Sequence, residues 1–254
     1  MNAFLKILSY PFSALFYLLF GLGLLFYDVI QRIALNVFGY NTHKTSVDLF
    51  NATIVRSLHV LGTRFTLDLP ENLPVGKPVI IVSNHQSMWD IPPLIWFLRK
   101  LHVKFISKIE LGKGIPSVSY NLKHGGSVLI DRKNPTQATR QIEKIARYIS
   151  ENNRAVVIFP EGTRSRDGVP KPFRKKGLFT LFEHAPDAYV LPVSISNSWK
   201  LQRYGMFPMP LGIHLKIKVH PPVKISAAAT KEALFEMVEA TVVSGVVIDT
   251  PKAL

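Results

Sequence analysis

The chain has 254 residues, 47% of them hydrophobic, and carries 31 Lys and Arg against 17 acidic residues, a formal net charge of +14. This length allows one large domain, or one domain with an appendage. The charge favours an anionic partner, and the high apolar content favours a membrane surface over nucleic acid. Cysteine is absent, which excludes disulfides, thiolate metal sites and a cysteine nucleophile.

An uncharged apolar stretch lies near the amino terminus. Residues 7–27 contain no charge and are long enough to cross a hydrocarbon core, and a second apolar-periodic segment continues to residue 38. Two interpretations remain open. One is a single spanning helix. The other, which we favour, is a helical hairpin that turns near Gly21-Leu22-Gly23 and lies in one leaflet, because its amphipathic second half suits an interface.

Beyond this segment, strands and helices alternate, which predicts an α/β fold with a mostly parallel central sheet flanked by helices. We expect an N-terminal membrane-associated helical region over residues 1–64, ending in a helix over 41–64, and an α/β domain over residues 65–254. The expected strands are 65–69, 79–83, 103–107, 127–131, 155–159, 189–195 and 213–219. The expected helices are 91–100, 111–123, 135–152, 175–185 and 230–244. The alternating pattern of 213–219 places that strand at an edge, and the proline in 189–195 places the other strand at an edge or a bulge.

The apolar strand 79–83 runs directly into residues 84–90, NHQSMWD. His85 and Asp90 can form a general-base pair, because a carboxylate bonded to one ring nitrogen fixes the tautomer and stabilises the cation. On a continuous helix the two side chains would lie about 140° apart, so the pair requires a turn. For an isolated pair, a solvated histidine and a capping aspartate would be the simpler interpretation. We set aside an acyl-Ser87 intermediate, since neighbouring residues on a tight turn seldom present a hydroxyl to the same imidazole.

A second motif, FPEGTRS at residues 159–165, also follows an apolar strand. Gly162 supplies backbone freedom, while Thr163 and Arg164 supply a hydroxyl and a planar cation that can wrap a phosphate. Glu161 could bond a substrate hydroxyl or hold Arg164. This motif alone could be an ordinary polar turn, and the Asp-Arg pair at 131–132 could be a simple salt bridge. Together they lie at the carboxyl ends of successive strands, where open α/β sheets bind ligands. They describe acyl transfer to a phosphate-bearing lipid.

The chain resembles the glycerolipid acyltransferases, specifically the 1-acylglycerol-3-phosphate (lysophosphatidate) O-acyltransferases. The resemblance covers about residues 79–197. It is carried by blocks at residues 84–90 (NH…D), 126–132 (GSVLIDR), 159–165 (FPEGTRS) and 191–194 (LPVS), with a Phe-basic-Gly element at 173–177 (FRKKG).

The resemblance implies roles for ten residues. His85 is the base and Asp90 its orienting partner. The acceptor phosphate site comprises Glu161, Gly162, Thr163, Arg164 and Arg132. Further substrate contacts are expected from Asn84, Lys104 and Ser165.

The function we expect is transfer of a fatty acyl group from acyl-CoA or acyl-carrier protein to the sn-2 hydroxyl of 1-acylglycerol-3-phosphate, giving phosphatidic acid. Alternatives are another lysophospholipid or lyso-aminolipid acceptor, a hydrolase using the same pair on water, and a non-catalytic membrane-surface adaptor. We expect no metal or other cofactor, because the eight histidines show no ligand spacing. The expected partners are membrane lipid, the acyl donor and an anionic membrane surface, without nucleic acid. The expected location is a bacterial inner membrane, with the catalytic domain cytoplasmic.

Overall fold

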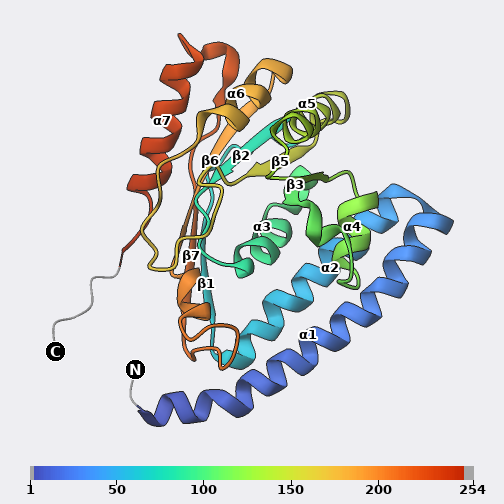
Figure 1. Ribbon diagram of the computed structural model, residues 1–254, viewed down its shortest axis with the longest axis vertical. Coiled ribbons are helices and arrows are strands. Elements are labelled where there is room, and N and C mark those ends of the chain that lie inside the picture. The colour runs from blue at the N-terminus through green and yellow to red at the C-terminus, as the bar shows by residue number, and fades with distance from the viewer. Residues whose placement is uncertain (1–2, 249–254) are drawn as a thin grey trace.

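A twisted sheet with helices on both faces forms the centre of the computed structural model, which describes residues 3–248 (Figure 1). The helices are α1 (Ala3–Phe38), α2 (Tyr40–Leu58), α3 (Ile91–Phe97), α4 (Val118–His124), α5 (Pro135–Asn152), α6 (Lys175–His184) and α7 (Lys231–Ser244). The strands are β1 (Arg64–Asp68), β2 (Val79–Ser83), β3 (Val103–Lys108), β4 (Val128–Ile130), β5 (Ala155–Ile158), β6 (Tyr189–Ser196), β7 (His214–Val219) and β8 (Val223–Lys224).

The strands are ordered β1-β7-β6-β2-β5-β3-β4, and β8 pairs with β6. Neighbours from β6 through β2, β5 and β3 to β4 are parallel, as are β1 and β7, whereas β6 runs antiparallel to β7 and β8. The prediction of a mostly parallel α/β sheet is therefore confirmed. The carboxyl ends of β2, β5, β3 and β4 meet at one edge of the sheet.

Alternate residues of the central strands pack into two cores, as the period-two geometry of a strand requires. In β2, Val79 and Ile81 face the core shared with α2 and α3, while Ile80 and Val82 face the core shared with α5, α6 and α7. All four are fully buried. A strand buried on both faces reads as a continuous apolar run, which is why β2 was recognisable in the sequence.

The two strands expected at an edge lie inside the sheet, so that prediction was wrong. β7 lies between β1 and β6, and its alternating burial arises because one face is only lightly covered. Pro192 is tolerated in β6 because it lies between the pair with β8 at Val190 and the pairs with β7 that begin at Val193. Its carbonyl accepts from the backbone N–H of His220, which places the nitrogen of Pro192 on that same side of β6. The missing donor therefore does not face β2, with which Pro192 is also in register.

The amino-terminal segment forms one continuous helix, α1, without a turn near Gly21-Leu22-Gly23. The predicted position of that turn was therefore wrong. The chain instead reverses at Gly39, whose φ of +79° lies in the region that glycine adopts without strain. The second arm is α2, which runs beside α1 (Figure 1) and buries residues such as Phe50 and Leu58 in the sheet core.

The outer face of α1 is apolar and exposed. Phe4, Ile7, Leu18, Phe26 and Val37 each expose more than half of their surface. By length and composition, Phe4–Phe38 could cross a membrane, and only 17% of its most apolar window is buried.

The inner face of α1 packs on the domain over much of its length. Ser13 Oγ accepts from the backbone N–H of Met209 at 2.8 Å, and Gln31 Nε2 donates to Ser117 Oγ at 2.5 Å. The helix is therefore held flat against the domain rather than projecting from it.

Candidate active site

The turn after β2 is shaped by hydrogen bonds within residues 84–90. Ser87 caps a short 3₁₀ turn, Met88–Asp90, by accepting from the backbone N–H of Trp89 at 3.1 Å. Asp90 reaches back to accept from the N–H of Ser87 at 3.0 Å, which completes a capping box. This reversal brings the side chain of Asp90 under that of His85, and α3 begins immediately afterwards with prolines in its first turn.

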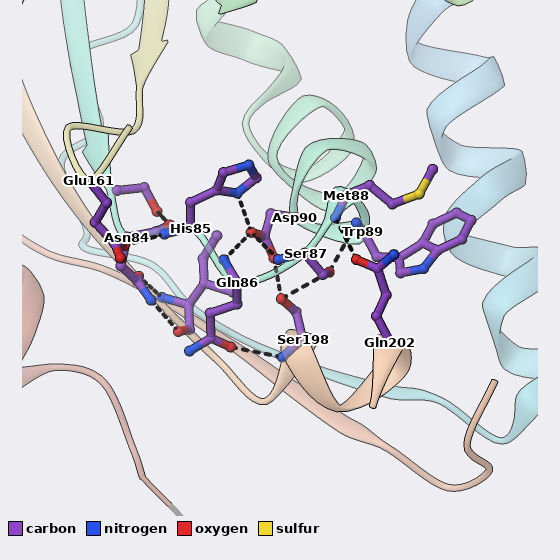
Figure 2. Close-up of polar contacts among 12 residues, drawn as sticks. Asn84, His85, Gln86, Ser87, Met88, Trp89, Asp90, Glu161, Ser198 and Gln202 are labelled. Carbon is purple, nitrogen blue, oxygen red and sulfur yellow. Dashed lines mark hydrogen bonds and ion pairs between the residues drawn. The ribbon is translucent and has the colours of Figure 1, made fainter. Parts of the chain in front are cut away.

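His85 and Asp90 are in direct contact. His85 Nδ1 lies 2.7 Å from Asp90 Oδ2, and the same oxygen also accepts from the backbone N–H of Gln86 at 2.7 Å (Figure 2). Asp90 Oδ1 accepts from the hydroxyl of Ser198. The carboxylate is fully buried, and these donors compensate for the loss of water around it. A carboxylate can only accept, so Nδ1 carries the proton and Nε2 keeps its lone pair.

The imidazole of His85 lies at the surface with one face covered. Its ring stacks on Phe159, with the centroids 4.1 Å apart and the planes 16° from parallel. Its side chain keeps 13% of its surface exposed. The Asp90 contact and the Phe159 stack hold the ring in one orientation, with Nε2 facing away from Asp90. A proton acceptor is thus presented at the carboxyl edge of the sheet.

Glu161 joins the two motif loops, and its expected part in a phosphate-binding site stays a prediction. Its Oε1 accepts from the backbone N–H of His85 at 2.6 Å, and its Oε2 accepts from that of Lys171 at 2.9 Å. Burial raises the pKa of Glu161, and the two backbone donors oppose that shift. Both oxygens are used within the protein, and a carboxylate would repel phosphate. Its role is to hold the loop that carries His85.

Asn84 and Ser165 are also internal and bond to groups of the protein, and their contacts with substrate stay predictions. Asn84 exchanges two hydrogen bonds with the backbone of Ile195, at 2.7 and 2.8 Å, and is fully buried. Ser165 donates to Asp167 Oδ1 at 2.7 Å, and its backbone N–H donates to the carbonyl of His85 at 2.8 Å. Short polar side chains at strand ends satisfy backbone groups here, and their sequence pattern is the same as that of ligand-binding residues.

Arg132, Arg164 and Arg174 gather around the carboxyl ends of the strands. Partial burial lowers the pKa of Arg132, and the positive charges of Arg174 and Arg164 act in the same direction. Arg174 covers Gly162 closely, since a Cβ at position 162 would lie 3.3 Å from Arg174 Nη1. Thr163 is exposed and makes no hydrogen bond within residues 3–248. We call the three arginines the arginine cluster.

Lys104 lies away from this edge, and its expected contact with substrate stays a prediction. It pairs in register with Val156, which is level with Ile80, five positions before His85. Its ammonium lies 4.9 Å from the centroid of the Tyr40 ring, and the residue is only 6% exposed. Burial, followed by neighbouring positive charges, lowers its pKa to about 7. Lys104 is the second residue of β3 and therefore lies near the amino end of that strand.

Sequence reasoning missed Ser198 and Gln86 and gave Arg174 no individual role. Ser198 follows β6, is fully buried, and its backbone N–H donates to Gln86 Oε1 at 3.0 Å. Its hydroxyl holds Asp90 from a position 108 residues along the chain. A contact at that separation leaves no spacing signal. Arg174 lies in the Phe-basic-Gly element. The sequence showed that this residue is basic but did not show that its side chain covers Gly162.

A family model described as Acyltransferase matches residues 64–196, just over half of the chain, and contains both motif loops. The chain belongs to this acyltransferase family. The sequence resemblance to glycerolipid acyltransferases is thereby confirmed.

Named relatives agree with this membership. A 1-acyl-sn-glycerol-3-phosphate acyltransferase of Limnanthes douglasii is 30% identical over 148 residues, 58% of this chain and 50% of the relative. The human beta enzyme of that name is 33% identical over 144 residues, 56% of this chain and 50% of the relative. The chain thus spans about half the length of these curated relatives.

A solved structure is similar over almost the whole chain. The crystal structure of the 1-acyl-sn-glycerophosphate acyltransferase PlsC from Thermotoga maritima has a TM-score of 0.79 and 28% identity, and 95% of each chain is covered. The acyltransferase fold of this chain therefore includes the amino-terminal helices as well as the sheet.

Proposed function

We propose that this acyltransferase moves a fatty acyl group from acyl-CoA or acyl-carrier protein to the sn-2 hydroxyl of 1-acylglycerol-3-phosphate, producing phosphatidic acid. The observation that carries the proposal is the His85–Asp90 pair, bonded at 2.7 Å and placed at the sheet edge where the arginine cluster lies. The base supplies the chemistry, and the cations supply an acceptor site for phosphate. The named relatives carry the same activity in their names.

His85 acts as a general base in this reaction. Nε2 takes the proton of the acceptor hydroxyl while that oxygen attacks the thioester carbonyl. As the tetrahedral intermediate collapses, the carbon–sulfur bond breaks and the proton passes to the departing thiolate, leaving a free thiol and a new ester. Asp90 stabilises the imidazolium between these two steps. General-base assistance of this kind is worth about 10²–10⁴-fold.

A covalent acyl-Ser87 intermediate is disfavoured by the position of Ser87. Its hydroxyl is fully buried, donates to Ser198 Oγ at 3.2 Å and accepts from the backbone of Trp89. It therefore faces the side of Asp90 away from the exposed imidazole edge. Direct transfer needs only the acceptor hydroxyl, the donor carbonyl and Nε2 in one place, and it requires no cofactor.

The acceptor reaches the site from a membrane surface along which α1 lies flat. A helix of 36 residues is about 54 Å long, well beyond the thickness of a hydrocarbon core. Its contacts with the domain extend from Ser13 to Gln31, and these would be lost if the helix crossed the bilayer. The exposed apolar face therefore lies in one leaflet, on the same side as His85.

The activity is tested with the purified full chain in uncharged detergent. The protein receives 1-acylglycerol-3-phosphate with either acyl-CoA or acyl-carrier protein, and products are identified by mass. We expect phosphatidic acid and free thiol in equal amounts. Faster acylation of a choline or ethanolamine lysolipid would contradict the phosphate acceptor. Free fatty acid formed without acceptor would indicate a hydrolase, and an inactive but folded protein would favour an adaptor.

The placement of α1 is tested by labelling, which is simplified by the absence of native cysteine. Lys6→Cys and Asn41→Cys are made separately, at exposed polar positions near the two ends of α1. In sealed vesicles with the catalytic domain outside, an impermeant maleimide should label both variants. Protection of one end until the vesicles are opened would show that α1 spans the bilayer.

A further inference from the structure

A basic hollow lies beside α1, separate from the arginine cluster. Its volume is about 350 Å³. Its lining residues come from α1, from the segment after β3 and from α4, and these elements are on the right of Figure 1. The residues that carry the argument are Arg32, Lys113, Tyr120, Lys123 and His124.

The guanidinium of Arg32 is held in place at this hollow. Its Nε donates to Asp28 Oδ2 at 2.8 Å, and its Cζ lies 4.6 Å from the centroid of the Tyr120 ring. Asp28 Oδ1 also accepts from the backbone N–H of Ser117 at 2.6 Å, immediately before α4. One carboxylate therefore positions the arginine and ties α1 to α4. This arrangement reduces the entropy lost when the guanidinium binds a ligand.

The positive charge around the hollow exceeds the negative charge. Lys113 and Lys123 are exposed and form no ion pair within residues 3–248, and the lining contains no acidic residue. Asp28 is the one neighbouring carboxylate in these contacts, and it is already bonded to Arg32 and Ser117. A planar guanidinium with two ammonium groups around one concave space suits a phosphate group, which accepts several charge-assisted hydrogen bonds at once.

The position of Arg32 on α1 indicates the source of the phosphate. Val29, Ile33 and Val37 lie within about one turn of it and are 57%, 48% and 68% exposed. If this face lies in a leaflet, the hollow is at the depth where lipid headgroups begin. We propose that the hollow binds the phosphate of an anionic phospholipid headgroup, distinct from the acceptor being acylated. This rests on the membrane association proposed above.

The test uses soluble lipids, so that general attraction to a charged bilayer does not contribute. Dihexanoyl-phosphatidylglycerol, dihexanoyl-phosphatidylcholine and adenosine 3′,5′-bisphosphate are titrated separately below their micelle concentrations into the full chain in uncharged detergent. Binding is measured by calorimetry for wild type, for Lys113→Gln/Lys123→Gln, and for the matched control Lys144→Gln/Lys224→Gln. The control lysines are exposed and lie on α5 and β8.

We expect saturable binding of phosphatidylglycerol that weakens about tenfold in Lys113→Gln/Lys123→Gln and is unchanged in the control. If Lys113→Gln/Lys123→Gln loses binding of adenosine bisphosphate but keeps binding of phosphatidylglycerol, the hollow binds a phosphate of the acyl donor. That result would overturn the lipid assignment. Equal behaviour of the two double variants would overturn the site itself. Turnover of micellar acceptor should be unchanged in both. A wild-type chain that binds phosphatidylglycerol but transfers no acyl group would refute only the proposed function.

Discussion

Histidines and cations gather at two ends of the same central strands, but their partners differ. At the carboxyl end, His85 is bonded to the buried carboxylate of Asp90. At the amino end, His43, His102 and Lys104 lie among further cations, and we call these three residues the amino-end cluster. Burial, followed by the charge of neighbouring cations, lowers the pKa of His43 and of His102 to about 4. A histidine becomes a useful base through the group that it contacts, and residue type alone does not decide it.

The strongest test of this comparison is to substitute His85 and His102 separately and to compare the loss of activity. His85→Ala should reduce acyl transfer by about 10²–10⁴-fold, because the acceptor hydroxyl loses its base. His102→Asn should retain turnover, since His102 has a φ of +52°, a conformation that asparagine tolerates. Initial rates on the same acceptor decide the matter. Similar losses in both variants would contradict the assignment of the base.

Removing one cation from the arginine cluster should affect the acceptor selectively. Arg164→Ala should raise KM for 1-acylglycerol-3-phosphate about 10- to 100-fold, the loss expected for a charge-assisted contact, with little change for the acyl donor. Arg140→Gln on α5 is the matched control. Steady-state kinetics with each substrate varied in turn measure the effect, and an equal rise for both substrates would move Arg164 to the donor site.

Ser198 sharpens the role of the carboxylate. Ser198→Ala removes the hydroxyl that donates to Asp90, so the carboxylate should hold the imidazolium less well and kcat should fall about tenfold. KM should stay constant, because Ser198 faces Asp90 and not the ligand. Thermal unfolding monitored in parallel separates this from a loss of folded protein. A change confined to KM would show that Ser198 acts on substrate.

The amino-end cluster predicts an effect on stability rather than on catalysis. The pKa of Lys104 is about 7 when folded and 10.5 in its ordinary state, so the unfolded chain binds more protons between these values and stability rises with pH across that window. Lys104→Met should therefore increase the free energy of unfolding by about 1–4 kcal/mol at pH 7. The gain should disappear towards pH 10. Denaturant unfolding at both pH values measures it, and a destabilised variant at pH 7 would contradict the prediction.

The sequence predicted the elements of the sheet well because their signals are local. Residues 79–83 form an apolar run, and helix α5 was predicted at its observed bounds, with Pro135 starting an amphipathic pattern. The order of the strands was not predictable in the same way. Whether Pro192 lies at an edge depends on where β8 ends and β7 begins beside it, which is a property of the assembled sheet.

The sequence identified residue types at the site more reliably than roles. The contact between His85 and Asp90 was inferable because five residues and one turn determine it. The family resemblance implied substrate-site roles for Asn84 and Glu161, and both side chains bond to distant backbone. Their partners, Ile195 and His85, lie 111 and 76 residues away. The domain limits and the roles of the arginines remain predictions.

Trp89 connects the apolar helix α1 to the turn that carries His85 and Asp90. Its ring lies edge-on against Phe16 and Phe20 of α1, with centroid separations of 5.1 and 5.4 Å, and its backbone is joined to that of Asp90. The inner face of α1 thus packs against the residue that precedes Asp90, the carboxylate bonded to His85. An unrelated hydrophobic helix in its place could bind lipid but would not reproduce the packing of Phe16 and Phe20 against Trp89. The sequence of α1 is therefore constrained by its packing on Trp89 as well as by its apolar outer face.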